Sequence, residues 1–448
     1  MNPKVDTIVA LATPPGRGGV AVIRVSGSHS KAIAETITRK QLIPRHATFS
    51  TFLDTHQHVL DEGLAIFFPG PHSFTGEDVL ELQGHGGPIV VDCLIHRVLE
   101  LGARLAKPGE FSERAFLNGK MDLVQAEAVA DLIQASSKQA MRSAIRSLQG
   151  EFSKKITVLV ETLIQTRLFL EAAIDFVEEE IDFLNNHQIE KKLSDMIHQF
   201  IAIETSAVQG SLLSEGITIV IAGEPNVGKS TLLNQLSGKE VAIVTDIPGT
   251  TRDLVREQIL IDGMPIHFID TAGIRNSVDP VEQEGIRRAK AEMAKADMVV
   301  FMTDASLSPP KKIELGMLPS LSVPILVIRN KIDLTHELPH VTQENDYTII
   351  SLSAQKKVGI DLLTAWIKQL AGYTATEDSF SARRRHLDAL SRAKHFLLQG
   401  QQQLQEHNAS ELLAEDLRQA QLALSDITGE FTSDDLLGRI FSSFCIGK

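Results

Sequence analysis

A glycine-rich segment, Gly223-Glu-Pro-Asn-Val-Gly-Lys-Ser230, has the residue types that bind phosphate. It follows a short apolar run, residues 217–222, and precedes an apolar helical pattern. In such a strand–loop–helix unit the glycines let backbone N–H groups turn toward phosphate oxygens, and the helix N-terminus adds partial positive charge. Lys229 would neutralise β- and γ-phosphate oxygens, and Ser230 would ligate Mg²⁺. The segment therefore predicts a site for a nucleoside triphosphate.

A second polar cluster follows the run 266–270, which reads as a strand. Asp270 at its end can hold the water shell of Mg²⁺, and the N–H of Gly273 can meet the γ-phosphate. In Ras-like proteins a glutamine comes directly after this Asp-Thr-Ala-Gly loop and orients the attacking water. This sequence has Ile274 there, which cannot hydrogen-bond. Another group must therefore position the water and offset the charge that develops between the β- and γ-phosphates.

The base is specified by two further segments. The apolar run 323–329 reads as a strand and leads into Asn330-Lys-Ile-Asp333. The Asp333 carboxylate can accept the N1–H and the 2-amino N–H of guanine, whereas adenine lacks this pair and would leave a desolvated carboxylate unpaired. Ser351-Leu-Ser-Ala354 fits the last base-contacting loop. Because the segments occur in order with strand and helix lengths between them, the sequence predicts GTP.

Two features are candidates for the missing catalytic group. The side-chain oxygen of Asn226 can coordinate a cation beside the phosphates, with carbonyl groups of residues 245–253 completing the ligand shell, or the amide can simply stabilise its loop. Thr251, which lies within residues 245–253, would be the usual Mg²⁺ ligand. Glu282 and Glu284, at the start of a predicted helix, can act through a bridging water or merely favour the helix dipole. The residue types leave both pairs of alternatives open.

The composition of the chain indicates how many domains it has and in which compartment it works. The chain has 448 residues, with 43% apolar and 23% charged, which is typical of a soluble protein with about three domains. No apolar run approaches the ~18 residues that span a bilayer, and the N-terminus lacks a basic signal-peptide region. Two cysteines, Cys93 and Cys445, indicate a reducing compartment. The net charge of −13 argues against an all-basic surface but allows a local basic patch for nucleic acid. We expect a cytoplasmic protein with no membrane segment.

The pattern of apolar residues and turns changes along the chain. Up to about residue 122, β-branched runs alternate with turns, and we expect a strand over 20–25 and a helix over 89–101. From 123 to 209 apolar residues recur every three or four positions, which marks long amphipathic helices, and the pattern returns after Ser381. Glu178-Glu-Glu180 reads as a solvated break between helices rather than a metal site.

Neither helical stretch would close a bundle alone. Two half-bundles flanking an insert would pack on each other, because the termini of a compact domain often lie close together. The predicted fold class is thus α/β plus α: an N-terminal α/β domain over 1–122, a helical domain from 123–214 and 376–448, and an inserted Ras-like P-loop domain over 215–375 with a mostly parallel sheet.

Several motifs together resemble the tRNA modification GTPase family MnmE, also called TrmE, along the whole chain. Two of them are the phosphate loop and Thr245 to Asp253; the others are Pro14-Pro-Gly-Arg-Gly-Gly19, Ser73-Phe-Thr-Gly-Glu-Asp78, Gln83-Gly-His-Gly-Gly87, Pro108-Gly-Glu-Phe111, Arg114-Ala-Phe116, Asn118-Gly-Lys120 and Cys445-Ile-Gly-Lys448. This combination is far more specific than the GTP motifs, which many GTPases share. Pro248 departs from the small residue expected there, although only its backbone would lie near a cation.

The resemblance implies how hydrolysis is catalysed. It implies K⁺-dependent dimerisation of the GTPase domains, with K⁺ held by Asn226 and backbone groups of Thr245, Ile247 and Thr250, and it makes Glu282 the favoured water-orienting residue. The GTP-binding residues so expected are Asn226, Val227, Gly228, Lys229, Ser230, Thr231, Thr245, Asp246, Ile247, Pro248, Gly249, Thr250, Thr251, Asp270, Thr271, Ala272, Gly273, Asn330, Lys331, Asp333, Ser353 and Ala354.

The resemblance also implies an N-terminal domain that dimerises and binds a tetrahydrofolate derivative, 5-formyl or 5,10-methylene. It points to Arg24, Glu81, Lys120 and Lys448 as the folate-binding residues, and to Cys445 as a catalytic thiol near the folate. A carboxylate can bind the amino-pyrimidinone edge of a pterin, while Arg or Lys meets anionic groups. Without the resemblance, Arg24 and Lys120 would be ordinary surface charges, and Cys445 a small buried hydrophobe.

The implied partner is an MnmG-type protein that uses FAD and NADH, with FAD on the partner only. A homodimer of this chain would join it in a heterotetramer or larger complex. Together they would add an aminomethyl or carboxymethylaminomethyl group to C5 of the wobble uridine of certain tRNAs.

Two other classes compete with this interpretation. A ribosome-assembly or translation GTPase would need an RNA-binding module such as a KH or OB domain, and no glycine loop or aromatic strand pattern of that kind is evident. A one-carbon-transfer enzyme would use the GTPase domain only for regulation. Two basic runs, Lys138/Arg142/Arg146 and Arg383-Arg-Arg385, are possible tRNA contacts, although such runs are more often solvated faces.

Overall fold

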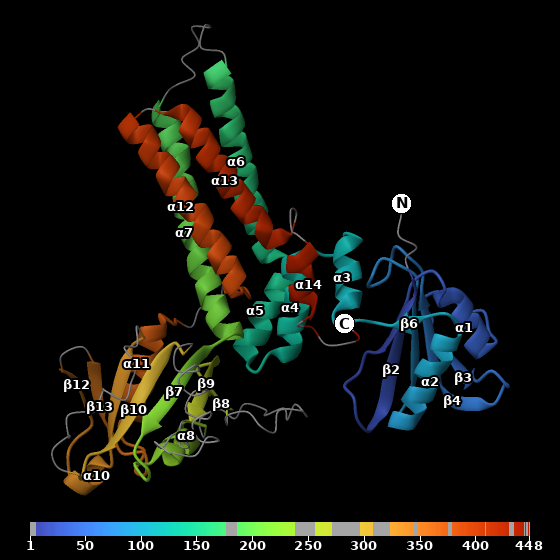
Figure 1. Ribbon diagram of the computed structural model, residues 1–448, viewed down its shortest axis with the longest axis horizontal. Helices are drawn as coiled ribbons and strands as arrows, with labels where there is room; N and C mark the ends of the chain where they lie inside the picture. Colours follow the sequence, from blue (N-terminus) through green and yellow to red (C-terminus); the bar gives the residue numbers. More distant parts are fainter. Residues whose placement is uncertain are drawn as a thin grey trace, which may run out of the picture. The chain divides into compact units, whose positions relative to one another are not determined.

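The computed structural model describes residues 6–175, 186–237, 256–270, 296–307, 323–344, 347–374, 379–407, 409–429, 434–442, 444 and 447 (Figure 1). The chain forms two compact units: one comprises Met1–Ala130, Ile156–Ile164 and Arg418–Lys448, and the other Asp131–Lys155 and Gln165–Leu417. Each contains one β-sheet together with helices, which is the predicted α/β plus α class. None of the described helices is long and apolar enough to span a membrane.

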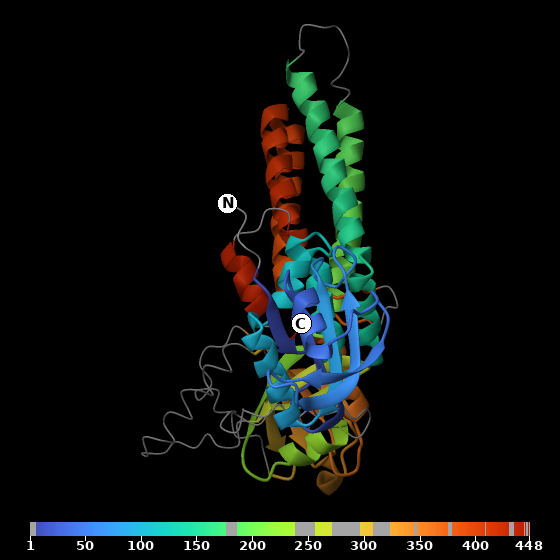
Figure 2. The same ribbon diagram turned by 90° about the vertical axis from the view of Figure 1, so that its right-hand side faces the viewer.

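The N-terminal sheet is mostly antiparallel, with strand order β3-β4-β5-β2-β1-β6 and one parallel pair, β1 with β6. Figure 2 shows it in blue. Its elements are β1 (Ile8–Leu11), β2 (Gly18–Ser26), α1 (Ser30–Thr38), β3 (Thr48–Leu53), β4 (Val59–Phe68), β5 (Val79–Gly86), α2 (Pro88–Glu100), β6 (Arg104–Leu105) and α3 (Glu110–Leu117). The predicted strand over 20–25 and helix over 89–101 are confirmed by β2 and α2.

The two faces of this sheet differ. On one face, Ile23, Leu80 and Leu82 form a core with side chains of α1 and α2. The other face carries the alternate residues of each strand, because successive side chains of a strand point to opposite faces. A smaller cluster around Phe111 covers only part of this second face. Exposed apolar side chains therefore remain there, including Val20 and Phe49, each 62% exposed.

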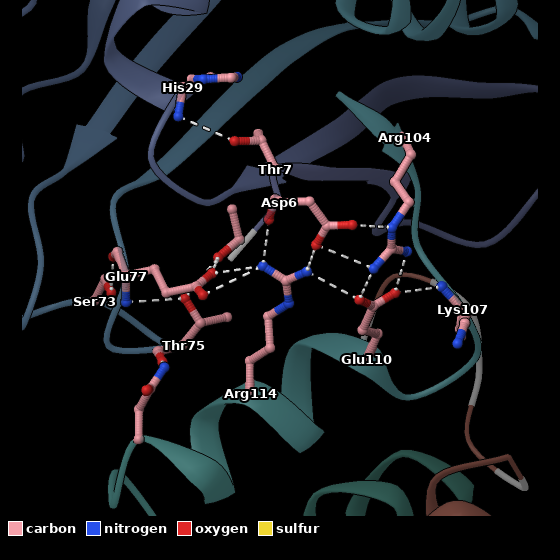
Figure 3. A network of polar contacts seen from close by, with 12 residues as sticks. Asp6, Thr7, His29, Ser73, Thr75, Glu77, Arg104, Lys107, Glu110 and Arg114 are labelled. Carbon is pink, nitrogen blue, oxygen red and sulfur yellow. Dashed lines mark hydrogen bonds and ion pairs between the residues drawn. The ribbon is translucent and has the colours of Figure 1, made fainter. Parts of the chain in front are cut away.

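A buried ionic network ties the start of β1 to α3 (Figure 3). Arg114 donates to Asp6 (Oδ1, 2.8 Å), Glu110 (Oε1, 3.0 Å) and Glu77 (Oε2, 3.1 Å), and Arg104 pairs with Asp6 and Glu110. Burial alone would raise the pKa of Glu110, but hydrogen bonds from Arg104 and Arg114 outweigh it and hold that pKa below its ordinary value. A charge this deeply buried needs its partners, since removing one leaves the others uncompensated.

The structure describes seven helices in the segments before and after the insert. They are α4 (Leu123–Gln134), α5 (Lys138–Leu148), α6 (Glu151–Asp175), α7 (Asn186–Ser214), α12 (Arg384–His407), α13 (Ser410–Thr428) and α14 (Asp434–Ser442). Helix α12 runs along α7 (Figure 1). Residues 178–180, the predicted break, lie outside the described residues.

The junctions of the insert are joined by one side chain. Gln209 of α7 donates from Nε2 to the carbonyl of Gly372 (2.7 Å) and accepts through Oε1 from the N–H of Thr374 (2.8 Å). One residue later, Gly210 lies so close to the returning chain that a Cβ would stand 1.7 Å from the carbonyl oxygen of Phe380. The segment that leaves the helices and the segment that returns to them are thus held side by side.

The insert is built on a seven-stranded sheet with order β12-β13-β11-β10-β7-β9-β8, parallel except at its two edge strands, as predicted. Its elements are β7 (Ile217–Gly223), α8 (Lys229–Ser237), β8 (Arg256–Ile261), β9 (Met264–Asp270), β10 (Met298–Asp304), β11 (Ile325–Asn330), α10 (Ile332–Thr335), β12 (His340–Glu344), β13 (Tyr347–Ser351) and α11 (Ile360–Ala371). Strand β11 starts later than predicted, after Pro324, whose nitrogen cannot donate to a neighbouring strand.

The close approach at Gly210 predicts a stability effect opposite to helix propensity. Alanine normally stabilises a helix by ~1 kcal/mol over glycine, but Gly210→Ala should destabilise by about 2 kcal/mol because the methyl group would displace the 379–382 segment. Thermal unfolding followed by circular dichroism should show a midpoint lower by about 4 °C or more. Gly438→Ala in α14 is the control, since a Cβ there meets nothing within 4 Å. Equal midpoints for the two variants would contradict the prediction.

Candidate functional site

The candidate site lies at the carboxyl edge of the parallel strands. Strands β9, β7, β10, β11 and β13 end there at Asp270, Gly223, Asp304, Asn330 and Ser351. Ligands of open α/β sheets bind at this edge, because the loops that follow the strands converge there. Three of the five predicted segments of polar residues, and Asp270 at the start of a fourth, therefore lie at one edge of the sheet.

The phosphate loop has the backbone that its glycines allow. Gly228 has a φ of +99°, and a Cβ on it would stand 2.3 Å from Nδ2 of Asn330. Asn226 has a φ of +64°, a left-handed conformation that asparagine tolerates better than most residues. Lys229 begins α8, followed by Ser230, so both stand at the helix N-terminus where an anion is favoured.

The Lys229 ammonium group is held over this loop. The residue is only 8% exposed, and its Nζ donates to the carbonyls of Gly223 (2.8 Å) and Glu224 (3.2 Å). Phosphate oxygens are stronger acceptors for an ammonium than neutral carbonyls, because the bond is then charge-assisted on both sides. The loop therefore fits a triphosphate.

One buried amide connects the phosphate loop to the base-contacting loops. Asn330 is 2% exposed; its Nδ2 donates to the carbonyl of Val227 (2.7 Å), and its Oδ1 accepts from the N–H of Ala354 (2.9 Å). Both polar atoms of the amide are thus used within the protein. Asn330 therefore fixes the distance between the loops.

The base-contacting carboxylate is also oriented by a neighbour. Ser353 donates from Oγ to Oδ1 of Asp333 (2.5 Å), which fixes the plane of the carboxylate. Lys331, with a left-handed φ of +69°, donates from Nζ to Oδ2 of Asp304 (2.7 Å). These bonds orient the side chains of Asp333 and Lys331 in the loop that is predicted to contact guanine.

Asp304 was not among the predicted site residues. Burial raises its pKa, but hydrogen bonds from Lys331 and Ser306 outweigh that effect and leave the pKa below its ordinary value. It therefore stays charged and anchors Lys331. The available signal was its position at the end of an apolar strand, β10, level with the other polar strand ends.

Many predicted residues lie outside the described part of the chain. The structure describes the backbone of Asp270 at the end of β9 but not Thr245, Asp246, Ile247, Pro248, Gly249, Thr250, Thr251, Thr271, Ala272, Gly273, Glu282, Cys445 or Lys448. Their assigned roles remain predictions.

The predicted folate residues fall into two places. Arg24 and Glu81 are brought together on β2 and β5, with Arg24 Nε donating to Glu81 Oε1 at 3.0 Å. The Arg24 guanidinium lies 5.3 Å from the centre of the Phe74 ring and 5.9 Å from that of Phe111. Lys120 donates from Nζ to the carbonyl of Pro71 (2.9 Å), so it borders the same 71–76 segment.

The sheet and its convergent loops define a P-loop protein that binds a guanine nucleotide. Residues 123–445 match the family model described as the MnmE helical domain, and residues 7–120 match the one described as the GTP-binding protein TrmE N-terminus. The chain belongs to the tRNA modification GTPase MnmE family. It is a GTPase, an enzyme that hydrolyses GTP and uses Mg²⁺.

Relatives that match over nearly their whole length support the assignment to this family. The tRNA modification GTPase MnmE of Proteus mirabilis (strain HI4320) is 58% identical over 451 residues, covering 99% of each chain. The protein of the same name from Hydrogenovibrio crunogenus is 57% identical over 446 residues, again covering 99% of each. Among solved structures, a variant of Aquifex aeolicus Era bound to GDP·AlF4⁻ is 29% identical and covers 41% of this chain and 67% of that chain, with a TM-score of 0.26.

The geometry of Asp333 predicts a change of base preference. Asp333→Asn places a donor where the carboxylate would accept from guanine, so GTP affinity should fall by about 100-fold or more while xanthosine triphosphate gains. Equilibrium titration with fluorescent nucleotide analogues measures both affinities. Asp361→Asn, an exposed first-turn carboxylate of α11, is the control. Unchanged GTP affinity in Asp333→Asn would contradict the assignment.

Proposed function

We propose that this chain, in the cytoplasm, hydrolyses GTP in a K⁺-dependent way. With an FAD-containing MnmG-type partner it would add an aminomethyl or carboxymethylaminomethyl group to C5 of the wobble uridine of certain tRNAs. The observation that carries the proposal is the 58% identity with a tRNA modification GTPase over 99% of both chains. The convergent phosphate and base loops support its GTP-dependent half.

The proposal divides the work among three domains. Residues 1–122 would bind folate and dimerise, residues 123–214 and 376–448 would form the helical domain, and residues 215–375 would form the GTPase domain. The start of β7 at Ile217 and the Gln209 bonds across the junction support the limits of the insert.

In the GTPase domain, each described residue has a task that needs no large movement. Lys229 exchanges two carbonyl acceptors for phosphate oxygens, and the N–H groups of the loop and of the start of α8 orient the phosphates. Asp333, held by Ser353, accepts the guanine N–H donors. Ser230 and Thr251 would hold Mg²⁺, and Glu282 would orient the attacking water.

Two requirements for hydrolysis remain, because Ile274 cannot orient the attacking water. Glu282 would orient the water, and a cation beside the phosphates would offset the negative charge that develops there. Asn226, with backbone groups of Thr245, Ile247 and Thr250, would hold K⁺ there. The left-handed φ of Asn226 gives a second, purely conformational reason for asparagine, so a test must separate the backbone from the side chain.

Asn226→Gly makes that separation, since glycine keeps the left-handed backbone and removes only the amide. We expect the wild-type protein to hydrolyse GTP at least about tenfold faster in K⁺ than in Na⁺ at equal ionic strength. In Asn226→Gly this difference should disappear while GTP still binds. Steady-state phosphate release and nucleotide titration measure the two quantities. Equal wild-type rates in the two salts would contradict K⁺ dependence, and K⁺ activation retained in Asn226→Gly would remove the side chain from the ion site.

The N-terminal domain would hold a tetrahydrofolate derivative, whose role is to supply a one-carbon unit. The paired Arg24 and Glu81 beside the Phe74 ring fit a pterin, which needs a carboxylate at its edge and an apolar contact on its face. Lys120 and Lys448 would meet the anionic tail. Gly447, on which a Cβ would stand 2.2 Å from the carbonyl oxygen of Leu11, lies at the end of β1. Its position, two residues after Cys445 in the sequence, supports a role for that thiol.

Homodimerisation is supported by the open face of the N-terminal sheet. Val20, Phe49 and Leu64 are exposed there, although apolar surface of this kind is normally buried against a partner. A second copy of the same face would cover it. This homodimer would then join the MnmG-type partner in a heterotetramer or larger complex.

Complementation of a deletion strain tests the function as a whole. The wild-type gene should restore modified wobble uridine, measured by mass spectrometry of tRNA, and Cys445→Ser should not, because a hydroxyl is a far poorer nucleophile than a thiolate. GTP hydrolysis should be normal in Cys445→Ser, and Cys93→Ser, at an exposed position, serves as the control. Failure of the wild-type gene would contradict the proposed function. Normal modification with Cys445→Ser would show that the tail is structural.

A further inference from the structure

Helix α5 has an unusual charge pattern for this chain. Among the helices that the structure describes, α5 is the one that carries three basic side chains, Lys138, Arg142 and Arg146, and no acidic one. The sequence contains no acidic residue from Leu132 to Gly150, although the net charge of the whole chain is −13. Such a pattern creates a local positive potential on a protein that would otherwise repel polyanions.

The inner face of α5 is fixed to the rest of its unit. Ala140, Ser143, Ala144 and Ser147 are buried along one side of the helix. Ser381 donates its N–H to the carbonyl of Ser143 (3.2 Å), and Ser147 donates from Oγ to the carbonyl of Ser381 (2.9 Å). These bonds hold the helix in one orientation, so the opposite side is presented as a rigid surface.

That outer face presents Lys138 and Arg142. Both residues are exposed, and the structure records no hydrogen bond or ion pair for either side chain among the residues it describes. They stand four residues apart, about 6 Å along the axis at a rise of about 1.5 Å per residue, which is close to the spacing of phosphates along an RNA strand. Lys154, in the first turn of α6, is a further exposed cation that follows the turn at Gly150.

The acidic residue that directly follows this segment in the sequence weakens the surface little. Glu151 is the acidic residue that begins α6, and it lies 3.7 Å from Arg146, with the two side chains 43% and 29% exposed. A pair at this distance and exposure contributes little, and it leaves Lys138 and Arg142 untouched.

The second basic run of the sequence is used differently. Arg383 donates from Nη2 to Oδ1 of Asp131 at 2.6 Å, in a pair whose side chains are 22% and 11% exposed. The N–H of Arg384 lies 3.4 Å from a carboxylate oxygen of Glu215. Arg383 and Arg384 therefore hold the start of α12. Their role differs from that of the exposed cations of α5.

We propose that the outer face of α5, with Lys138, Arg142 and Lys154, binds the phosphate backbone of the tRNA substrate. The proposal rests on the proposed function for tRNA as the substrate, and adds where the RNA docks. Phosphate contacts of this kind fix the position of a nucleic acid without reading its sequence. A rigid, basic, acid-free helix face is suited to that task.

The test compares two double variants of the full-length protein that lose the same charge. Lys138→Ala/Arg142→Ala removes the α5 surface, and Lys191→Ala/Lys192→Ala removes two exposed lysines of α7. Binding of a fluorescently labelled, transcribed tRNA that has a wobble uridine is measured by anisotropy at several salt concentrations. The α5 variant should bind about tenfold more weakly at about 0.1 M salt, and the slope of log K against log salt should fall by about 1 to 2.

The controls separate this inference from the proposed function. GTP hydrolysis should be unchanged in both variants, because the substituted side chains are exposed and remote from the nucleotide loops in sequence. The thermal midpoint should be unchanged in the α5 variant; in the α7 variant it can fall slightly, because Lys192 lies 5.1 Å from the centre of the Phe169 ring. If the wild-type protein binds tRNA and the α5 variant binds like the α7 variant, the α5 proposal is wrong, including the case in which this face docks a protein. If the wild-type protein does not bind tRNA at all, the proposed substrate is wrong and the docking surface with it.

Discussion

The buried amide of Asn330 is the constraint on which the nucleotide site depends. It holds Val227 of the phosphate loop and Ala354 of the last base loop, while its own strand leads to Asp333. Separating these loops would leave a buried amide without partners, at a cost of ~1–3 kcal/mol for each group. The conformations of the phosphate loop and the base-contacting loops therefore depend on one another. It also explains Gly228, because any side chain there would meet the amide nitrogen at 2.3 Å.

A similar connection runs from the sheet to the helices of the same unit. The β8–β9 hairpin turns at Asp262 and Gly263; Ser137 donates from Oγ to the carbonyl of Gly263 (2.8 Å), and Tyr373 donates from its hydroxyl to the carbonyl of Asp262 (2.9 Å). Ser137 is also the N-cap of α5, where it accepts from the N–H of Ala140. The hairpin turn, the start of α5 and the end of the insert are thereby joined by two side-chain hydroxyl groups that donate to backbone carbonyls.

The sequence predicts what depends on neighbours along the chain. Strand β7, the phosphate loop and helix α2 follow from local periodicity and from a motif whose spacing is set by one loop. The sequence does not reveal which charges meet across long separations. Arg114 pairs with Asp6 over 108 positions, and Lys331 with Asp304 over 27, so neither pair has a local signal. Asp304 was missed for that reason, whereas Asp333 was found because guanine recognition requires a carboxylate within the loop itself.

The positive charges of this chain divide according to what they face. Arg114 and Arg383 are largely buried opposite carboxylates, so their charge is neutralised inside the fold and cannot act on a distant anion. Lys229 is buried opposite neutral carbonyls, which leaves its charge for a phosphate. Lys138 and Arg142 are exposed on a helix without acidic residues, so their charge reaches solvent. In a protein with a net charge of −13, attraction for a polyanion must come from such places, and the burial of the other cations determines where those places are.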